Sequence, residues 1–128
     1  QARLDEFFRL AVERLSPYNA LLVREFSVEA AKQAADGSLD FVYIDGNHEL
    51  SHVIADLTAW APKVRKGGVV AGHDYITRGN PSPGMHVKEA VHAYTSAWRI
   101  EPLFVVGRKD IVSGEVRDKP RSWMWVVE

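Results

Sequence analysis

A short apolar segment that ends abruptly in an acidic residue and a glycine constrains the fold of this chain more than any other feature. The segment spans residues 39–45, and Gly46 and His48 follow its terminal Asp45. A strand this apolar is expected to be buried on both faces, as the strands of parallel sheets are. Because open α/β sheets bind ligands at the carboxyl ends of such strands, a carboxylate and a glycine at this position predict a functional site.

The same arrangement occurs a second time further along the chain. Residues 69–73 form another apolar strand pattern, which also ends in polar residues, here His73 and Asp74. Two strands with matching side chains at their ends are harder to explain as ordinary turns than one. We therefore expect Asp45 and Asp74 to reach into one crevice shared by neighbouring parallel strands.

Hydrophobic periodicity and turn residues predict that helices and strands alternate along the chain. This alternation implies right-handed βαβ crossovers and a mostly parallel sheet, whereas two successive strands at the end predict that the last one is antiparallel. Trp60 and Trp98 fall on apolar helix faces and are expected in the core. The predicted helices are residues 3–15, 27–35, 51 to about 66 and 87–98, and the predicted strands are residues 20–23, 39–45, 69–73, 103–106 and 123–127.

Composition narrows the class of protein and its partners. The 128 residues suffice for a single domain, which we assign to residues 1–128, and the net charge of −1 gives no electrostatic case for nucleic acid or an anionic membrane. Without cysteine the chain has no disulfide or thiolate metal site, which suits a reducing cytoplasm. No apolar run approaches the roughly 20 residues that a membrane-spanning helix needs. We therefore expect a cytoplasmic protein whose partners include neither nucleic acid nor a membrane.

Four segments occur in an order that is more specific than any one of them. They are LDFVYIDGNH at 39–48, ADLTAW at 55–60, PKVRKGGVVAGHDY at 62–75 and VKEAV at 87–91. This run resembles the class I S-adenosylmethionine-dependent methyltransferases, in particular the small-molecule branch whose fourth strand reads F-(V/I)-x-I-D-G-(D/N)-H. The resemblance implies an incomplete Rossmann-like methyltransferase fold of the α/β class. It also implies transfer of a methyl group from S-adenosylmethionine to a small-molecule acceptor, in the first place to a hydroxyl.

The resemblance assigns three residues to the cofactor. Asp45 and Gly46 correspond to the strand end that lies near the amino-acid moiety of S-adenosylmethionine, and Ser27 follows the strand that the family places beside the adenine ring. Each has a simpler interpretation that the sequence leaves open. Asp-Gly pairs are common in turns, and Ser27 is equally well placed to cap a helix.

The resemblance also implies catalytic and metal-binding roles at the two strand ends. His48, His73 and Asp74 are the catalytic candidates, and Asp45, His73 and Asp74 are the candidate ligands of a divalent cation. Metal-dependent relatives have Asp and Asn where this chain has His73 and Asp74. Oxygen ligands favour Mg²⁺, and an added imidazole shifts the preference towards metals such as Mn²⁺. Tyr75 is expected to line the acceptor pocket, and the loop 76–85, which follows the second strand at the ligand-binding edge, is expected to form a lid over the substrate.

Part of the family's fold has no counterpart in the sequence. The glycine-rich loop after the family's first strand and the acidic residue after its second strand are missing, and the Gly67–Gly68 pair precedes a strand instead of joining a strand to a helix. One edge of strand 39–45 would then be uncovered. We expect a truncated product, a part of a longer protein, or self-association that covers this edge. Without the cofactor-binding loop, the chain on its own is expected to be inactive as a methyltransferase.

Two other classes of function fit some of the residues. A methyltransferase-like remnant that only assembles with a partner would explain the missing cofactor loop. A metallophosphoesterase would explain Gly46-Asn-His-Glu49, which matches a ligand motif of those enzymes, but their upstream D-x-H and G-D-x-x-D ligands are absent. The sequence does not specify the methyl acceptor or the oligomeric state.

Overall fold

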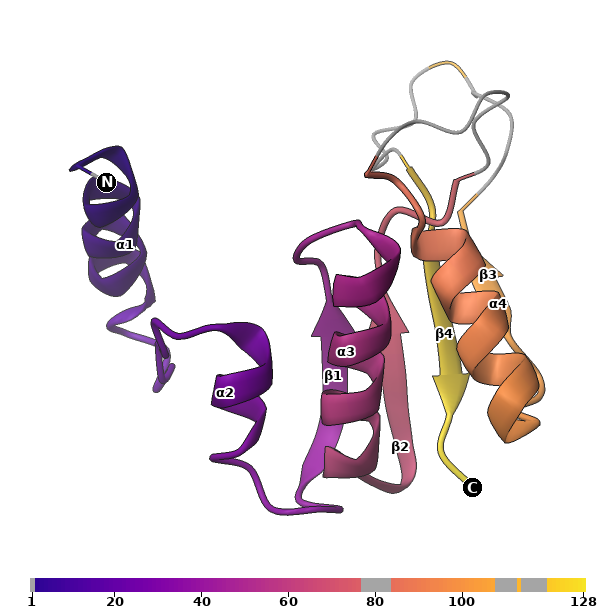
Figure 1. Ribbon diagram of the computed structural model, residues 1–128. Coiled ribbons are helices and arrows are strands. Elements are labelled where there is room, and N and C mark those ends of the chain that lie inside the picture. Colours follow the sequence, from indigo (N-terminus) through magenta and orange to yellow (C-terminus); the bar gives the residue numbers. More distant parts are fainter. Residues whose placement is uncertain (1, 77–83, 108–112, 114–119) are drawn as a thin grey trace.

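The computed structural model describes residues 2–76, 84–107, 113 and 120–128, and these form one four-stranded sheet with helices on it (Figure 1). The strand order is β1-β2-β4-β3, and α3 and α4 pack against each other over one face of the sheet. No helix in the described ranges is long and apolar enough to span a membrane. The elements are α1 (Ala2–Leu15), α2 (Ser27–Ala31), β1 (Leu39–Ile44), α3 (Leu50–Trp60), the 3₁₀ turn η1 (Ala61–Lys63), β2 (Val64–Gly72), α4 (Val87–Trp98), β3 (Phe104–Val106) and β4 (Ser122–Val126).

The sheet is mixed, which corrects the prediction of a mostly parallel one. β1 and β2 are parallel, whereas β4 lies between β2 and β3 and is antiparallel to both. The antiparallel last strand is therefore confirmed. β1, β2 and β3 still run in the same direction. Because β4 lies between β2 and β3, β1 and β2 are the one hydrogen-bonded parallel pair in the described sheet. The α/β class agrees with the prediction.

The core lies between the helices and the sheet. Val53 and Leu57 are four residues apart and so face the sheet from one side of α3, and Val91 does the same from α4. Val70 of β2 and Trp123 of β4 meet them, and all five side chains are almost fully inaccessible to water. Burying side chains of this size contributes about 1.5–3 kcal/mol each to folding. This core fixes how the ends of β1 and β2 sit relative to α3.

The amino-terminal part of the chain packs differently from the prediction. α1 has no buried residue and stands apart from the sheet, and residues 20–23 form no strand. Strand formation needs a hydrogen-bonding neighbour, and the described β1 pairs with β2 alone. Leu21 is accordingly 87% exposed.

The boundaries around the two adjacent glycines also differ from the prediction. α3 ends at Trp60, and Gly67 and Gly68 lie inside β2 instead of ending a helix. Gly67 has a φ of +73°, and a Cβ on Gly68 would come within 2.7 Å of the Asp40 carbonyl oxygen. The register between β1 and β2 shifts at this point. The glycines therefore allow an irregular stretch that lets β2 pass close to β1.

Ser27 and the two tryptophans also occupy unexpected positions. Phe26 is the N-cap of α2, and the Ser27 hydroxyl instead accepts a hydrogen bond of 2.9 Å from the Trp60 indole N–H. Trp60 is half-buried, and Trp98 is 68% exposed because it is the last residue of α4, beyond the part that faces the core. The expected helix from Ser27 to residue 35 ends at Ala31.

Replacing Ser27 by alanine should lower the free energy of unfolding by about 1 kcal/mol or less, because one solvent-accessible hydrogen bond between α2 and α3 is lost. Urea unfolding followed by circular dichroism measures this difference. Ser51→Ala is the matched control, since Ser51 is exposed and forms no side-chain hydrogen bond recorded for the described residues. Equal stability of all three proteins would show that the Ser27–Trp60 contact does not hold α2 in place.

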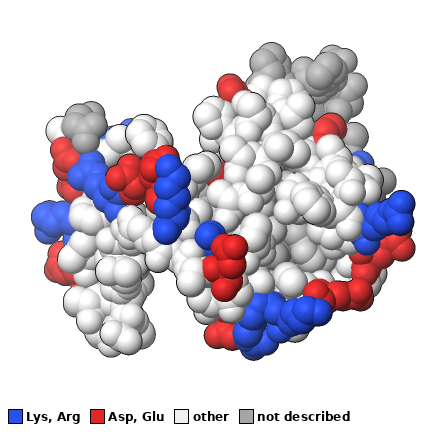
Figure 2. All heavy atoms as spheres, turned by 60° about the horizontal axis from the view of Figure 1, so that its bottom comes forward, with Lys and Arg blue, Asp and Glu red and all other residues white. Residues whose placement is uncertain are grey.

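Surface charge is balanced on the face seen in Figure 2, where basic and acidic side chains lie side by side. Among the described residues, Lys63 pairs with Asp36 at 2.6 Å, and Arg65 pairs with Asp40 at 2.6 Å. The Arg65–Asp40 pair is exposed on both sides, and exposed pairs stabilise a fold little.

Candidate functional site

The carboxyl ends of β1 and β2 meet at one edge of the sheet. Ile44 pairs with Gly72 in the parallel ladder, and the His73 N–H donates to the Ile44 carbonyl oxygen at 3.1 Å. The residues that follow, Asp45 and Asp74, therefore emerge next to each other. This is the convergence that the apolar strand patterns predicted.

Four side chains gather at these strand ends. His48 Nε2 lies 2.8 Å from Asp74 Oδ2 and 3.8 Å from Asp45 Oδ1. One ligand atom from each of Asp45, His48 and Asp74 lies within 4.8 Å of the other two. His73 Nδ1 lies 3.4 Å from Asp74 Oδ2 and 3.9 Å from Asp45 Oδ1. We call these four residues the strand-end site.

The backbone around Asp74 is held in an unusual conformation. Asp74 has a φ of +59°, in the left-handed region that Asp enters more easily than most residues, and it is buried. On one side of it, the Trp123 indole N–H donates to the His73 carbonyl oxygen at 3.0 Å. On the other side, the Tyr75 N–H donates to the Arg121 carbonyl oxygen at 2.9 Å. Conformations of this kind persist where the surroundings hold them, and they are frequent at functional sites.

The loop between β1 and α3 places His48 and Gly46. The Asn47 side-chain oxygen accepts a hydrogen bond from the Glu49 N–H at 2.9 Å, and the His48 carbonyl oxygen accepts one from the His86 N–H at 2.9 Å. Gly46 has no side chain that could reach the strand-end site. A Cβ built at this position would lie 3.5 Å from Asp56 Oδ2. The buried Asp56 carboxylate behind this turn was not predicted. The sequence signal that could have indicated Asp56 is its position inside the ADLTAW segment.

Ser27 is not brought to the strand-end site. Its partner Trp60 ends α3, whereas His48 precedes the start of that helix. Eleven residues of α-helix span about 16 Å. The predicted contact of Ser27 with the adenine ring stays a prediction.

Tyr75 and His92 form a pair that sequence reasoning missed. The Tyr75 hydroxyl lies 2.6 Å from His92 Nε2, and the Lys88 and Arg121 cations lie 5.7 and 5.8 Å from the centre of its ring. Tyr75 is buried, and its predicted role in lining the acceptor pocket stays a prediction. Residues 77–83 of the predicted lid lie outside the described residues. No sequence pattern linked Tyr75 to His92, because they come from separate elements.

A small cavity of about 10 Å³ lies among Asp45, His48, His73 and Asp74 and their neighbours. A cavity must reach about this size to hold one water molecule. Two carboxylates beside two imidazoles form a donor set that suits a divalent cation, since oxygen ligands bind Mg²⁺ and imidazole adds affinity for Mn²⁺, Fe²⁺ or Zn²⁺. A cation would also offset the repulsion between the two neighbouring carboxylates. The residues present therefore fit the metal-binding prediction, which remains to be measured.

Comparison with known families decides what kind of domain carries this site. Residues 2–75 match a family model described as a methyltransferase domain. The chain belongs to this methyltransferase family. The resemblance inferred from the strand-end motifs is thus confirmed, and membership implies S-adenosylmethionine as the methyl donor.

The individual proteins that this chain matches are longer than the chain itself. It is 37% identical over 57 residues to the uncharacterized protein y4gI of Sinorhizobium fredii (strain NBRC 101917 / NGR234), a match that covers 44% of this chain and 6% of that protein. The solved O-methyltransferase NovP matches with a TM-score of 0.58 at 21% identity, over 90% of this chain and 42% of NovP. A structural-genomics protein of Corynebacterium glutamicum matches with a TM-score of 0.54 at 17% identity, over 91% of this chain and 52% of that protein. The chain therefore has the fold of about half of each solved structure.

Proposed function

We propose that this chain is the carboxyl-terminal portion of an S-adenosylmethionine-dependent methyltransferase that methylates a hydroxyl group of a small molecule. The observation that carries the proposal is the convergence of Asp45, His48, His73 and Asp74 at the ends of two parallel strands. Such crevices are where open α/β sheets bind their ligands. The O-methyltransferase fold of NovP supports the choice of a hydroxyl acceptor.

The chemistry asks the protein mainly for alignment. The acceptor oxygen forms a bond to the methyl carbon while the carbon–sulfur bond breaks and its electron pair returns to sulfur, and the hydroxyl proton must leave. Holding donor and acceptor in line provides most of the acceleration in a reaction of this kind. Asp45 and Gly46, at the end of β1, are the proposed contacts of the cofactor.

His48 is the proposed general base. If its Nε2–H donates to Asp74 Oδ2, which lies 2.8 Å away, the other ring nitrogen keeps a lone pair that can take the hydroxyl proton. Asp45, His73 and Asp74 would hold a divalent cation. When bound, such a cation lowers the pKa of an acceptor hydroxyl and fixes its direction.

The edge of β1 that faces away from β2 pairs with no strand among the described residues, and this edge is part of the proposal. Phe41 and Tyr43 alternate with inward-facing residues on β1, are half-exposed, and stack on each other with ring centres 6.2 Å apart. An uncovered strand edge with aromatic side chains favours further pairing. We infer that either additional strands of a longer protein or a second copy of the chain covers this edge. A cytoplasmic location completes the proposal, because the chain has no cysteine to oxidise.

A non-catalytic methyltransferase-like module is the second candidate. It is favoured by one observation, namely that Gly67 and Gly68 lie within β2 and so do not form the cofactor-binding turn of the family. A phosphoesterase has less support, because its upstream ligand motifs are absent from the sequence. Hydrolysis of an aryl phosphate with Mn²⁺ would revive it.

Calorimetric titration of S-adenosylmethionine separates the first two candidates. We expect a longer form of the protein, with a glycine-rich strand–turn–helix unit before Gln1, to bind the cofactor, and the 128-residue chain to bind it far more weakly. The physical reason is that the family's glycine-rich turn supplies backbone N–H groups that this chain lacks. The heat of binding measures both affinities. Binding by neither form would contradict the methyltransferase function and favour the non-catalytic module.

A further inference from the structure

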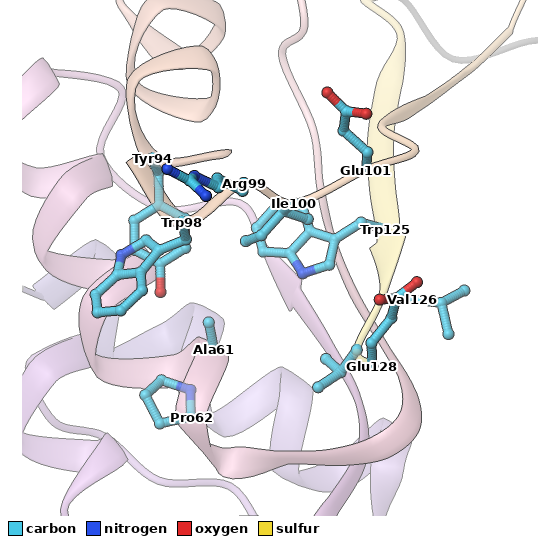
Figure 3. A pocket seen from close by; sticks show the side chains of 11 residues that line it. Ala61, Pro62, Tyr94, Trp98, Arg99, Ile100, Glu101, Trp125, Val126 and Glu128 are labelled. Carbon is cyan, nitrogen blue, oxygen red and sulfur yellow. The ribbon is translucent and has the colours of Figure 1, made fainter. Parts of the chain in front are cut away.

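No described helix covers one of the two faces of the sheet (Figure 1). α3 and α4 lie over the other face, where Val42, Val70 and Trp125 stand in one row of paired residues. Because successive side chains of a strand point to opposite faces, the neighbouring rows point away from these helices. Figure 3 shows this alternation in β4, where the side chains of Trp125 and Val126 leave the strand on opposite sides.

Apolar side chains form most of this second face. Phe41 and Tyr43 of β1 stack on each other, and the Tyr43 hydroxyl lies 2.7 Å from Ser122 Oγ on β4, on the far side of β2. Val69 of β2 and Met124 of β4 continue the surface towards β3. The half-exposed apolar members are 44–54% accessible to water, and we call them the uncovered sheet face: Phe41, Tyr43, Phe104, Val106 and Val126.

The uncovered sheet face is large for the surface of a monomer. An aromatic side chain buries about 150–250 Å² when it is fully covered, so three half-exposed aromatic rings and two valines present roughly 400 Å² of apolar surface. Monomeric soluble proteins rarely expose more than a few hundred Å² in one patch, and larger patches mark interaction sites. We therefore expect a partner to cover this face.

α1 carries an apolar stripe that is also uncovered in the described chain. The helix has no buried residue, and Leu4 and Phe7, one turn apart, are 60% and 52% exposed. Arg24 ties α1 to the segment before α2, because it pairs with Asp5 and its guanidinium lies 5.3 Å from the centre of the Phe8 ring. These contacts hold α1 beyond the β1 edge and apart from its own sheet (Figure 1).

We propose that a second copy of the chain covers both surfaces, with α1 of each copy packed on the uncovered sheet face of the other around a two-fold axis. A helix stripe and a sheet face are natural partners, since each buries its apolar side against the other. Exchanging an identical element between two copies is a low-cost route to a closed dimer. α1 stands on the side from which a second copy would also reach the unpaired β1 edge.

The dimensions suit this exchange. The 14 residues of α1 are about 21 Å long, and a sheet of four strands is about 14 Å wide, so one helix can cover the face. Each copy contributes its sheet face and its α1 stripe, which together come to roughly 700 Å². Stable interfaces of standard size bury about 800 Å² on each partner. The interface does not depend on methyl transfer, so its test stands whether or not the chain is part of an enzyme.

Light scattering coupled to size-exclusion chromatography measures the mass of the purified chain in solution. We expect a dimer at about 100 μM, because interfaces of standard size have dissociation constants in the micromolar range or below. Phe7→Glu places a charge on the α1 stripe, and Phe41→Thr removes a ring from the uncovered sheet face. Each should weaken dimerisation at least about tenfold, since each change occurs twice in a symmetric dimer. Both residues are exposed within one chain, so circular dichroism should show that the variants fold.

Mixing the two variants tests the exchange itself. Phe7→Glu keeps an intact sheet face and Phe41→Thr keeps an intact α1, so a mixed dimer regains one complete helix–sheet contact. We expect the mixture to contain more dimer than either variant alone. Trp98→Ala is the control, because Trp98 is an exposed aromatic residue at the end of α4, on the helix-covered side of the sheet (Figure 3). It should dimerise like the wild type.

Three results would overturn the proposal. The first is a wild type that is monomeric at this concentration, or that forms open-ended larger assemblies, because exchange around a two-fold axis closes. The second is a dimer that persists in Phe7→Glu, which would show that the copies meet without α1. The third is a mixture of the two variants with no more dimer than each variant alone, which would exclude reciprocal exchange.

Discussion

Replacing Gly72 by alanine is expected to lower the free energy of unfolding by about 3 kcal/mol, at the upper end of what overpacking a core costs. A Cβ on Gly72 would lie 2.3 Å from Trp123 Cζ2 and 2.5 Å from the Ile44 carbonyl oxygen, both far inside contact distance. Neither neighbour can move aside easily. Trp123 is fully buried and its indole N–H is bonded to the His73 carbonyl oxygen, while Ile44 is part of the β1–β2 ladder.

Urea unfolding of the wild type and Gly72→Ala measures this loss. Gly46→Ala is the matched control, because a Cβ there meets its nearest neighbour, Asp56 Oδ2, at the ordinary contact distance of 3.5 Å. We expect Gly46→Ala to remain close to the wild type in stability. If Gly72→Ala were as stable as Gly46→Ala, the close approach of β4 to the end of β2 would be wrong.

The strand-end site was predictable because two strong local signals coincide there. An apolar strand ending in a polar residue occurs twice, and parallel neighbours must bring their carboxyl ends to one edge. Nothing beyond the residue patterns was needed to expect Asp45 near Asp74. His48 and His73 were included in the predicted site because His48 follows the first of these strands and His73 ends the second. The distances among the four side chains agree with this expectation.

Other parts of the structure depend on contacts that no local pattern encodes. β4 enters between β2 and β3, and strand order is a property of the whole sheet. Residues 20–23 have strand-like composition but no neighbour among the described strands. Composition alone therefore predicted a strand that does not form. Trp98 continues the apolar spacing of α4 and yet is 68% exposed at the last residue of that helix. Spacing predicts which face a side chain lies on, not whether anything covers that face.

The same reasoning explains why the sequence did not indicate the packing of Tyr75 against α4. It directly follows Asp74, and its sequence position suggested a place at the ligand-binding edge. The chain turns at Asp74, whose φ is +59°, and so directs Tyr75 away towards His92 on α4. Because of the left-handed backbone at Asp74, the Asp74 side chain lies in the strand-end site, whereas the Tyr75 side chain supports Asp74 from outside it. Tyr75 and Trp123 therefore support Asp74 from outside the strand-end site.

Asp74→Asn should weaken Mn²⁺ binding about 100-fold, and Asp45→Asn only about tenfold, because affinity for such cations depends on the number and setting of charged oxygen ligands. The Asp74 side chain is 11% exposed and lies 2.8 Å from His48 Nε2, whereas that of Asp45 is 50% exposed, so water can substitute for Asp45 more readily. Asparagine also tolerates the left-handed backbone, so the fold should persist in Asp74→Asn. Electron paramagnetic resonance of free Mn²⁺ measures both affinities.

Asp40→Asn is the control for this comparison, because it removes one negative charge from an exposed side chain on β1 that pairs with Arg65. It should leave Mn²⁺ binding unchanged. Circular dichroism of the variants establishes that each is folded. Equal Mn²⁺ affinity in the wild type and Asp74→Asn would mean that the buried carboxylate only orients His48. A larger loss in Asp45→Asn than in Asp74→Asn would instead move the centre of the site towards the end of β1.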